Sequence, residues 1–212
     1  MQGNQVVFVD GVRTPFGRAG EKGMYWKTRA DDMIVSAIIG LLERNPGIPA
    51  ERIDDVAIAA TTQEGDQGLT LGRTAAILAG LPLSVPGFAI DRMCAGAMTA
   101  VTTLAGGIAA GAYDIALAGG VEHMGRHPLG RDIDPNPRFL AEKLVSPDAL
   151  NMGITAERLH DRFPQLTKER ADRMGMLSQH KVEAAPSGAE SPRRPFHRDF
   201  HLDADVAPSV RR

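Results

Sequence analysis

The sequence predicts an α/β protein in which strands and helices alternate in the order β-α-β-α-β-α-β. Three observations indicate this class. Short apolar runs rich in β-branched residues recur along the first part of the chain, longer segments with helical periodicity separate them, and glycines, prolines and asparagines mark most boundaries. Helical crossovers join parallel strands, so we expect a mixed, partly parallel sheet with helices on both faces.

The first strand is predicted at residues 6–9, where an apolar and largely β-branched run precedes an Asp-Gly turn. The first helix follows over residues 33–42. Its apolar side chains recur at three- and four-residue spacing after two aspartates, and an Asn-Pro-Gly sequence at residues 45–47 ends it. The single apolar stripe predicts that this helix packs one face on the sheet.

The rest of the core domain repeats this alternation. Apolar runs of strand length alternate with segments of helical period, and a proline or a pair of glycines ends several of them. The elements are expected at residues 56–60 (strand), 72–81 (helix), 88–90 (strand), 94–111 (helix) and 115–118 (strand). Together they predict a core domain over residues 1–125.

The third of these helices contains no charged side chain from Cys94 to Ala112. Small residues recur on one helical face and apolar residues on another, namely Gly96, Ala100, Thr103, Gly107 and Gly111, and Met98, Val101, Ala105 and Ile108. We therefore expect a helix that is buried on nearly all sides. A membrane span is the alternative, and we reject it because Gly, Ala and Thr dominate the run rather than Leu and Ile.

Cys94 is the only cysteine, and it stands at the start of this helix, directly beyond the third predicted strand. Unpaired N–H groups and the helix dipole at such a position favour the thiolate and lower a cysteine pKa. A buried cysteine that acts as a small hydrophobic residue is the ordinary alternative. Ligands of α/β folds gather at the carboxyl ends of strands, which favours a nucleophile at Cys94.

The chain changes character after residue 125. Prolines break a loop-rich segment before helical patterns resume at residues 149–160 and 167–185. Residues 126–185 are therefore predicted to form a lid or insertion. From residue 186 the sequence combines prolines, charges and histidines without a period, which predicts a disordered tail over residues 186–212.

Composition argues against several functional classes. The 212-residue chain has a formal net charge of -2, which argues against an electrostatic nucleic-acid surface. A single cysteine excludes an internal disulfide framework and, with the polar start, predicts a cytoplasmic location. P-loop, dinucleotide-binding and Cys-x-x-Cys motifs are absent. His197 and His201 have i, i+4 spacing but lie in the predicted disordered tail, so we expect no metal site.

A cysteine nucleophile needs a base, and histidine is the residue type that most often supplies one. The candidates outside the predicted tail are His123, His127, His160 and His180. The sequence places none of them beside Cys94, and a solvated or capping role is commoner for each.

Four motifs in the right order resemble the N-terminal half of thiolases, and most resemble the degradative 3-ketoacyl-CoA thiolases of fatty-acid β-oxidation. They are RTPFG at residues 13–17, GRTAAILAGLPLSVPGFAIDRMCAGAM at 72–98, GGVEHMG at 119–125 and MGITAE at 152–157. The resemblance covers residues 6 to about 185. It implies a thiolase-like N-terminal core domain followed by a helical loop-domain segment that covers the site and helps to hold CoA.

By this resemblance, Cys94 attacks the keto carbonyl of a 3-ketoacyl-CoA, releases acetyl-CoA and holds the shortened acyl group as a thioester until CoA takes it. Met152 matches the methionine with which the family lines its acyl pocket. The resemblance further implies coenzyme A as a substrate and no bound cofactor or metal. For an intact protein it implies a homo-oligomer or an association with a hydratase/dehydrogenase subunit.

The chain departs from the family pattern in several places. Asp91-Arg92-Met93 precedes Cys94 where the family commonly has Asn-Arg, a serine-free run follows it, and Gln179 replaces a usual histidine. The second half of thiolases, which supplies an activating histidine, a second cysteine and part of the oxyanion hole, has no counterpart. Two alternatives stay open: a ketosynthase-like condensing enzyme, and a truncated inactive remnant or partner-binding fragment with a large apolar surface.

Overall fold

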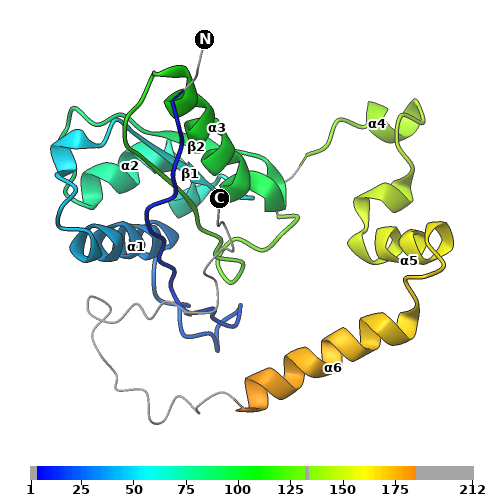
Figure 1. The fold of residues 1–212 in the computed structure, drawn as a ribbon. Helices are drawn as coiled ribbons and strands as arrows, with labels where there is room; N and C mark the ends of the chain where they lie inside the picture. Colours follow the sequence, from blue (N-terminus) through cyan, green and yellow to red (C-terminus); the bar gives the residue numbers. More distant parts are fainter. Residues whose placement is uncertain (1–3, 132–133, 185–212) are drawn as a thin grey trace. The chain divides into compact units, whose positions relative to one another are not determined.

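The computed structural model describes residues 4–131 and 134–184. The chain divides into two compact units after Arg131, so that residues 4–131 belong to the first and residues 134–184 to the second (Figure 1). Each unit is described by itself. The predicted disordered tail at residues 186–212 lies outside the described residues.

The first unit is built on a three-stranded sheet in the order β2-β1-β3. The strands are β1 (Asp55–Ala59), β2 (Phe88–Ile90) and β3 (Ala116–Gly120), which correspond to three of the four predicted strands. Both pairings are parallel, with Ala57 opposite Phe88 on one side and Ala118 on the other. The carboxyl ends of the described strands therefore meet at one edge, and the α/β class is confirmed.

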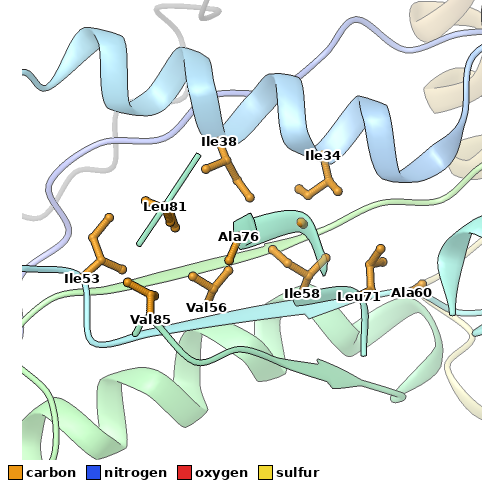
Figure 2. Close-up of a cluster of buried hydrophobic side chains, with 11 residues drawn as sticks. Ile34, Ile38, Ile53, Val56, Ile58, Ala60, Leu71, Ala76, Leu81 and Val85 are labelled. Carbon is orange, nitrogen blue, oxygen red and sulfur yellow. The ribbon is translucent and has the colours of Figure 1, made fainter. Parts of the chain in front are cut away.

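Helices cover both faces of the sheet, as predicted. α1 (Ala30–Arg44) and α2 (Leu71–Leu78) lie on one face, where their buried side chains meet Val56 and Ile58 of β1 (Figure 2). Burying one such Val, Ile or Leu side chain contributes roughly 1.5–3 kcal/mol. This cluster is the larger of the cores on the two faces of β1.

α3 (Gly96–Ala110) lies on the opposite face, where Ala100 and Leu104 pack against Ala57. Successive strand residues point to opposite faces, so Val56 and Ile58 serve one core while Ala57 serves the other. Short 3-10 helices precede β1, α2 and α3, namely η1 (Ala50–Arg52), η2 (Gly65–Gln67) and η3 (Met93–Ala95). All of β1 is buried, which makes it the centre of the unit.

The predicted first strand at residues 6–9 does not form. Val7, Phe8 and Val9 are 68, 71 and 66% exposed. A cavity of about 560 Å³ is lined both by this N-terminal segment and by residues 117–125 of β3 and the loop after it. A strand requires a hydrogen-bonded neighbour, so β-branched residues without a partner stay in irregular backbone. The prediction of a strand here is wrong.

Side-chain contacts hold this N-terminal segment in place instead. Asn45, directly after α1, donates a hydrogen bond to Asp10 over 2.9 Å, and Arg44 lies 3.3 Å from the same carboxylate. The Tyr25 hydroxyl donates to the carbonyl of Pro15 over 3.0 Å. The hydrogen bond from Asn45, together with that from the Gly11 amide and the charge of Arg44, lowers the pKa of Asp10.

α3 is buried on one side only. Gly96, Ala100 and Leu104 are its buried residues, whereas Met98 and Val101 are 67 and 45% exposed. The prediction of burial on nearly all sides is therefore wrong. The sequence shows correctly that no face of the helix is charged. Burial on nearly all sides would also require a second packing surface, whereas the sheet covers only one side of the helix.

By length and composition, the stretch Met93–Ala110 could cross a membrane, with a mean hydropathy of 1.5 and 17% of its residues buried. Such a stretch is weak evidence for a membrane span, because crossover helices of α/β cores can be equally long and apolar. Here the helix packs Ala100 and Leu104 against β1 and connects β2 to β3 in a parallel sheet, which is the ordinary place of a crossover helix.

The second unit contains α4 (Arg138–Ala141), η4 (Pro147–Leu150), α5 (Met152–Arg162) and α6 (Lys168–Ala184). α5 and α6 confirm the helices predicted at residues 149–160 and 167–185. Asn151 caps α5, since its side-chain oxygen accepts hydrogen bonds from the amides of Gly153 and Ile154 over 2.9 and 3.2 Å. No residue of α5 or α6 is buried within the part of the chain that the structure describes.

Candidate functional site

Cys94 lies at the turn between a strand and a helix. β2 ends at Ile90, η3 follows, and α3 begins at Gly96. The thiol forms no disulfide and is exposed. The structure thus confirms the predicted place of Cys94, at a helix start beyond a strand, and shows a side chain that is open to solvent rather than packed.

The backbone directly before Cys94 is strained. Met93 has a φ of 47°, in the left-handed region that side chains other than glycine rarely adopt. A residue held in such a conformation costs about 1–3 kcal/mol, and such residues cluster at functional sites. Because the Met93 side chain is 53% exposed, its own packing recovers little of this cost. The strain is part of the tight turn that leads from β2 to Cys94.

Small residues allow the start of α3 to press directly on the carboxyl edge of the sheet. A Cβ at Gly96 would lie 2.7 Å from the Cβ of Ala59, at the end of β1. A Cβ at Gly120, at the end of β3, would lie 3.1 Å from the Cβ of Ala97. Side chains at these glycines would push the helix away from the strands, and Cys94 would move with it.

The start of α3 has no side-chain cap. Ala95 occupies the N-cap position, makes no capping hydrogen bond, and no acidic residue lies in the first turn. N–H groups at a helix start that no cap uses favour a bound or developing negative charge. The turn around Cys94 therefore lies beside N–H groups that can donate hydrogen bonds to the oxygen of a reacting carbonyl.

Two further loops meet at this edge of the sheet through Gln67, which is 0% exposed. Its Nε2 donates hydrogen bonds to the Thr62 carbonyl over 2.7 Å and to Glu122 Oε1 over 2.8 Å. Its Oε1 accepts the backbone N–H of His123 over 2.6 Å, and Glu122 also accepts the amide of Thr61 over 2.7 Å. The loops after β1 and β3 are thereby locked together. No local pattern predicts this network, because it joins residues far apart in the chain.

His123 has a structural role. Its ring is buried, with Nε2 lying 2.8 Å from the carbonyl of Tyr25, while Nδ1 accepts the amide of Arg126 over 3.2 Å. These partners assign the ring hydrogen to Nε2, which donates it to the carbonyl. Both ring nitrogens of His123 are therefore engaged away from Cys94.

The other histidines are also placed by the structure, with the exception of His197 and His201, which lie outside the described residues. His127 contacts the carboxylates of Glu64 and Asp66. His160 and His180 are exposed or nearly so on α5 and α6 of the second unit. Within residues 4–131, both histidine rings are engaged by groups other than Cys94.

Met152 is the first residue of α5 and is 68% exposed. It belongs to the second unit, whereas Cys94 belongs to the first. Its role at the acyl pocket stays a prediction. Among the described residues, no group of three or more His, Cys, Asp or Glu side chains is placed to hold a metal ion.

Comparison with known proteins gives the family. The family model described as the N-terminal domain of thiolase matches residues 6–190, most of the chain. The chain belongs to the thiolase family. The 3-ketoacyl-CoA thiolase of Saccharophagus degradans is 38% identical over 210 residues, which are 99% of this chain and 52% of that protein. Those of Idiomarina loihiensis and Salmonella typhimurium are 38 and 37% identical, over 85 and 87% of this chain and 46 and 47% of their own lengths.

This thiolase chain spans about half the length of the curated relatives it matches. The resemblance drawn from its four motifs is confirmed, including the N-terminal position of the matched region. The relatives carry the name of 3-ketoacyl-CoA thiolases, which favours this branch over a ketosynthase.

Proposed function

We propose that this chain carries the acyl-accepting cysteine of a 3-ketoacyl-CoA thiolase, and that this cysteine is Cys94. The observation that carries the proposal is the exposed thiol in a strained turn between β2 and the uncapped start of α3. Membership of the thiolase family supports the reaction class.

In the proposed reaction, the Cys94 thiolate attacks the keto carbonyl carbon of a 3-ketoacyl-CoA. The bond from that carbon to the neighbouring methylene breaks, and its electron pair leaves as the enolate of acetyl-CoA, which takes up a proton. The shortened acyl group stays on Sγ as a thioester. The sulfur of a second CoA, after loss of its proton, then attacks this thioester and restores the thiolate of Cys94.

The setting of the reaction is part of the proposal. Met152 would line the acyl pocket, which its exposed position at the start of α5 permits. Coenzyme A would act as a substrate, with no resident cofactor. Fatty-acid β-oxidation in the cytoplasm is the proposed context, supported by the degradative motifs and the single cysteine. A homo-oligomer, or an association with a hydratase/dehydrogenase subunit, is the proposed assembly of a complete protein.

Mass spectrometry of the purified chain after incubation with acetoacetyl-CoA tests the role of Cys94. We expect an acetyl thioester on the peptide that contains Cys94, removed by hydroxylamine and absent from Cys94→Ser. One acetyl-CoA should be released as the adduct forms, and a second should form when CoA is added. An adduct that persists in Cys94→Ser, or an unmodified Cys94 after prolonged incubation, would reject the proposal for this chain.

A second candidate function is favoured by the outer face of α3. Met98 and Val101 of α3 are 67 and 45% exposed, and Met93 of the preceding η3 is 53% exposed, on a stretch without charge. Under this proposal the chain associates through this face with a second thiolase polypeptide. Light scattering coupled to size-exclusion chromatography tests it, because a clean monomer at all concentrations, with or without a thiolase partner, would exclude association.

A further inference from the structure

A carboxylate outside the residues assigned to acyl transfer joins two loops at the carboxyl edge of the sheet. Glu122, in the loop after β3, is exposed, but both of its oxygens are engaged. Oε2 accepts the backbone amide of Thr61 over 2.7 Å, and Oε1 accepts the side-chain amide of Gln67 over 2.8 Å. Thr61 lies just after β1, whereas Gln67 is the last residue of η2. One side chain therefore fixes two parts of the loop after β1 to the end of β3.

The side chain of Gln67 is held in one orientation. It is fully buried, its Nε2 also donates to the Thr62 carbonyl over 2.7 Å, and its Oε1 accepts the amide of His123 over 2.6 Å. Gln67 can therefore face Glu122 only with an N–H group. Because the Thr61 amide is a donor as well, the side chain at position 122 has to present two acceptors. An ionised carboxylate does so, whereas a carboxamide has one acceptor and one donor group.

The hydrogen bonds of Glu122 continue into the ends of the neighbouring strands. The amide of Ala60 donates to the carbonyl of Ile90, the last residue of β2, over 3.4 Å. The amide of Val121, next to Glu122 in the chain, donates to the carbonyl of Ala59 over 2.9 Å. Glu122 thus adds two hydrogen bonds at the point where the ends of β1, β2 and β3 are tied together.

The start of α3 rests on the same strand ends. An added Cβ at Gly96 would lie 2.7 Å from the Cβ of Ala59, and one at Gly120 would lie 3.1 Å from the Cβ of Ala97. These close approaches leave no spare room between the helix and the ends of β1 and β3. A change in the spacing of the two strand ends therefore alters the surface under the first turn of α3, and Cys94 moves with that turn.

The strained turn before Cys94 depends on this support. Met93 keeps a φ of 47°, although its exposed side chain contributes little packing. A residue in such a conformation persists only when the surrounding structure holds it there. Within the turn, the amide of Ala95 donates to the carbonyl of Arg92 over 3.1 Å. The strand ends and the start of α3, on either side of the turn, supply further support.

We propose that Glu122 is a positioning residue for acyl transfer. Its carboxylate holds the ends of β1 and β3 together beneath the start of α3, and it thereby keeps the sulfur of Cys94 in the orientation that attack on a keto carbonyl requires. This inference rests on the proposed acyl-accepting role of Cys94. Glu122 acts through the backbone and is assigned no contact with the reacting atoms.

The rate at which acetoacetyl-CoA acetylates Cys94 in the full-length chain, measured by mass spectrometry over a range of substrate concentrations, tests this role. Glu122→Gln has nearly the same size but sets a donor group against another donor. We expect its limiting rate to fall about 10- to 100-fold, because small displacements of a reacting group have effects of this order. The substrate concentration that gives half the limiting rate should change by less than about twofold, since substrate contacts are kept.

The matched control is Glu43→Gln, which removes an exposed carboxylate from α1 and should behave like the parent chain. An unchanged limiting rate in Glu122→Gln, with acetylation of the parent chain, would overturn the positioning role and leave the proposed role of Cys94 intact.

A reversed pair separates positioning from a general loss of stability. Gln67→Glu alone sets two carboxylates against each other and should be slow. When it is combined with Glu122→Gln, the new carboxamide can accept from Thr61 and donate to the new carboxylate, so the contact is restored with donor and acceptor exchanged. The double variant should therefore be acetylated about fivefold faster than Gln67→Glu, which equally lacks the donor to the Thr62 carbonyl. A double variant that is no faster would contradict the positioning role.

Amide hydrogen exchange gives a test that does not require acyl transfer. In Glu122→Gln, the amides of Ala60 and Ala95 should exchange about fivefold faster than in the parent chain, the size expected for the loss of one hydrogen bond, and Glu43→Gln should leave them unchanged. Unchanged exchange in Glu122→Gln would overturn the proposal whether or not Cys94 is acetylated. Faster exchange in a chain whose Cys94 is never acetylated would reject the proposed acyl-accepting role and still support the hold of Glu122 on the turn.

Discussion

α1 and α3 are both 15 residues long and cover opposite faces of the same sheet, but their outer faces differ. The outer side of α1 carries charged side chains such as Asp32, Glu43 and Arg44. The outer side of α3 carries none and exposes Met98 and Val101. Two helices of equal length on the same sheet can therefore differ in what they present to solvent. The outer face of α1 is charged, whereas that of α3 is apolar and uncovered.

The largest effects are expected when a buried side chain of each helix is shortened to alanine. Ile38→Ala on α1 and Leu104→Ala on α3 should each cost about 2–5 kcal/mol in the free energy of unfolding. Ile38 belongs to the larger buried cluster, so its loss should lie nearer the upper end. Urea denaturation measures both values. A larger loss for Leu104→Ala would reverse this order and would indicate that α3 contributes the main core.

The same substitution at two glycines of α3 should have opposite effects. Gly96→Ala places a Cβ 2.7 Å from Ala59 and should cost about 1–3 kcal/mol. Gly106→Ala meets nothing within 4 Å and should gain about 0.5–1 kcal/mol from helix propensity. Thermal unfolding of the two variants measures the contrast. Stabilisation by Gly96→Ala would mean that α3 does not press on the end of β1.

The outer faces can be compared by placing one lysine on each. Met98→Lys on α3 and Glu43→Lys on α1 should each change the free energy of unfolding by no more than about 0.5 kcal/mol, because both side chains are exposed. Met98→Lys alone should reduce self-association, as measured by light scattering against concentration. Equal effects of the two variants on association would remove the distinction between the helices.

The smallest expected effect concerns Asp54, which accepts the amides of Asp114 and Ile115 over 2.7 and 3.0 Å in the connection from α3 to β3. These hydrogen bonds, first that from Ile115, lower the pKa of Asp54. A lowered pKa stabilises the fold above the unfolded value of about 3.9, and the contribution is lost as pH falls through the folded value.

Because Asp54 is exposed, solvent screening limits the contribution to about 0.5 kcal/mol. Asp54→Asn should therefore be slightly less stable than the parent chain at pH 7 and nearly equal to it at pH 3. Denaturation at both pH values measures the difference. A gap that widens as pH falls would contradict the role of this carboxylate.

Patterns within short stretches of sequence predicted most of the first unit. Residues 88–90 form the predicted strand, the other two strands and α1 and α2 agree within a few residues, and Cys94 stands where a strand leads into a helix. These features follow from hydrophobic period and turn residues, which are local.

Features that depend on distant partners could not be predicted in this way. Residues 6–9 have strand composition but no neighbouring strand, and α3 has the composition of a buried helix but one packing surface. The contacts of Gln67 with Glu122 and of Asp66 with His127 join residues that no sequence period relates. Their chemistry is visible only once the loops after β1 and β3 are placed side by side.

The outer edge of β3 has a physical consequence of its own. Among the described strands, β1 alone pairs with β3, and the sequence ALAGG carries no charged side chain that would discourage pairing along the other edge. Open edges of this kind recruit strands from neighbouring molecules in crowded solutions, and glycine-rich edges do so without a fixed register. Concentrated samples of this chain should therefore tend towards amyloid-like stacking, which dilution and short storage would limit.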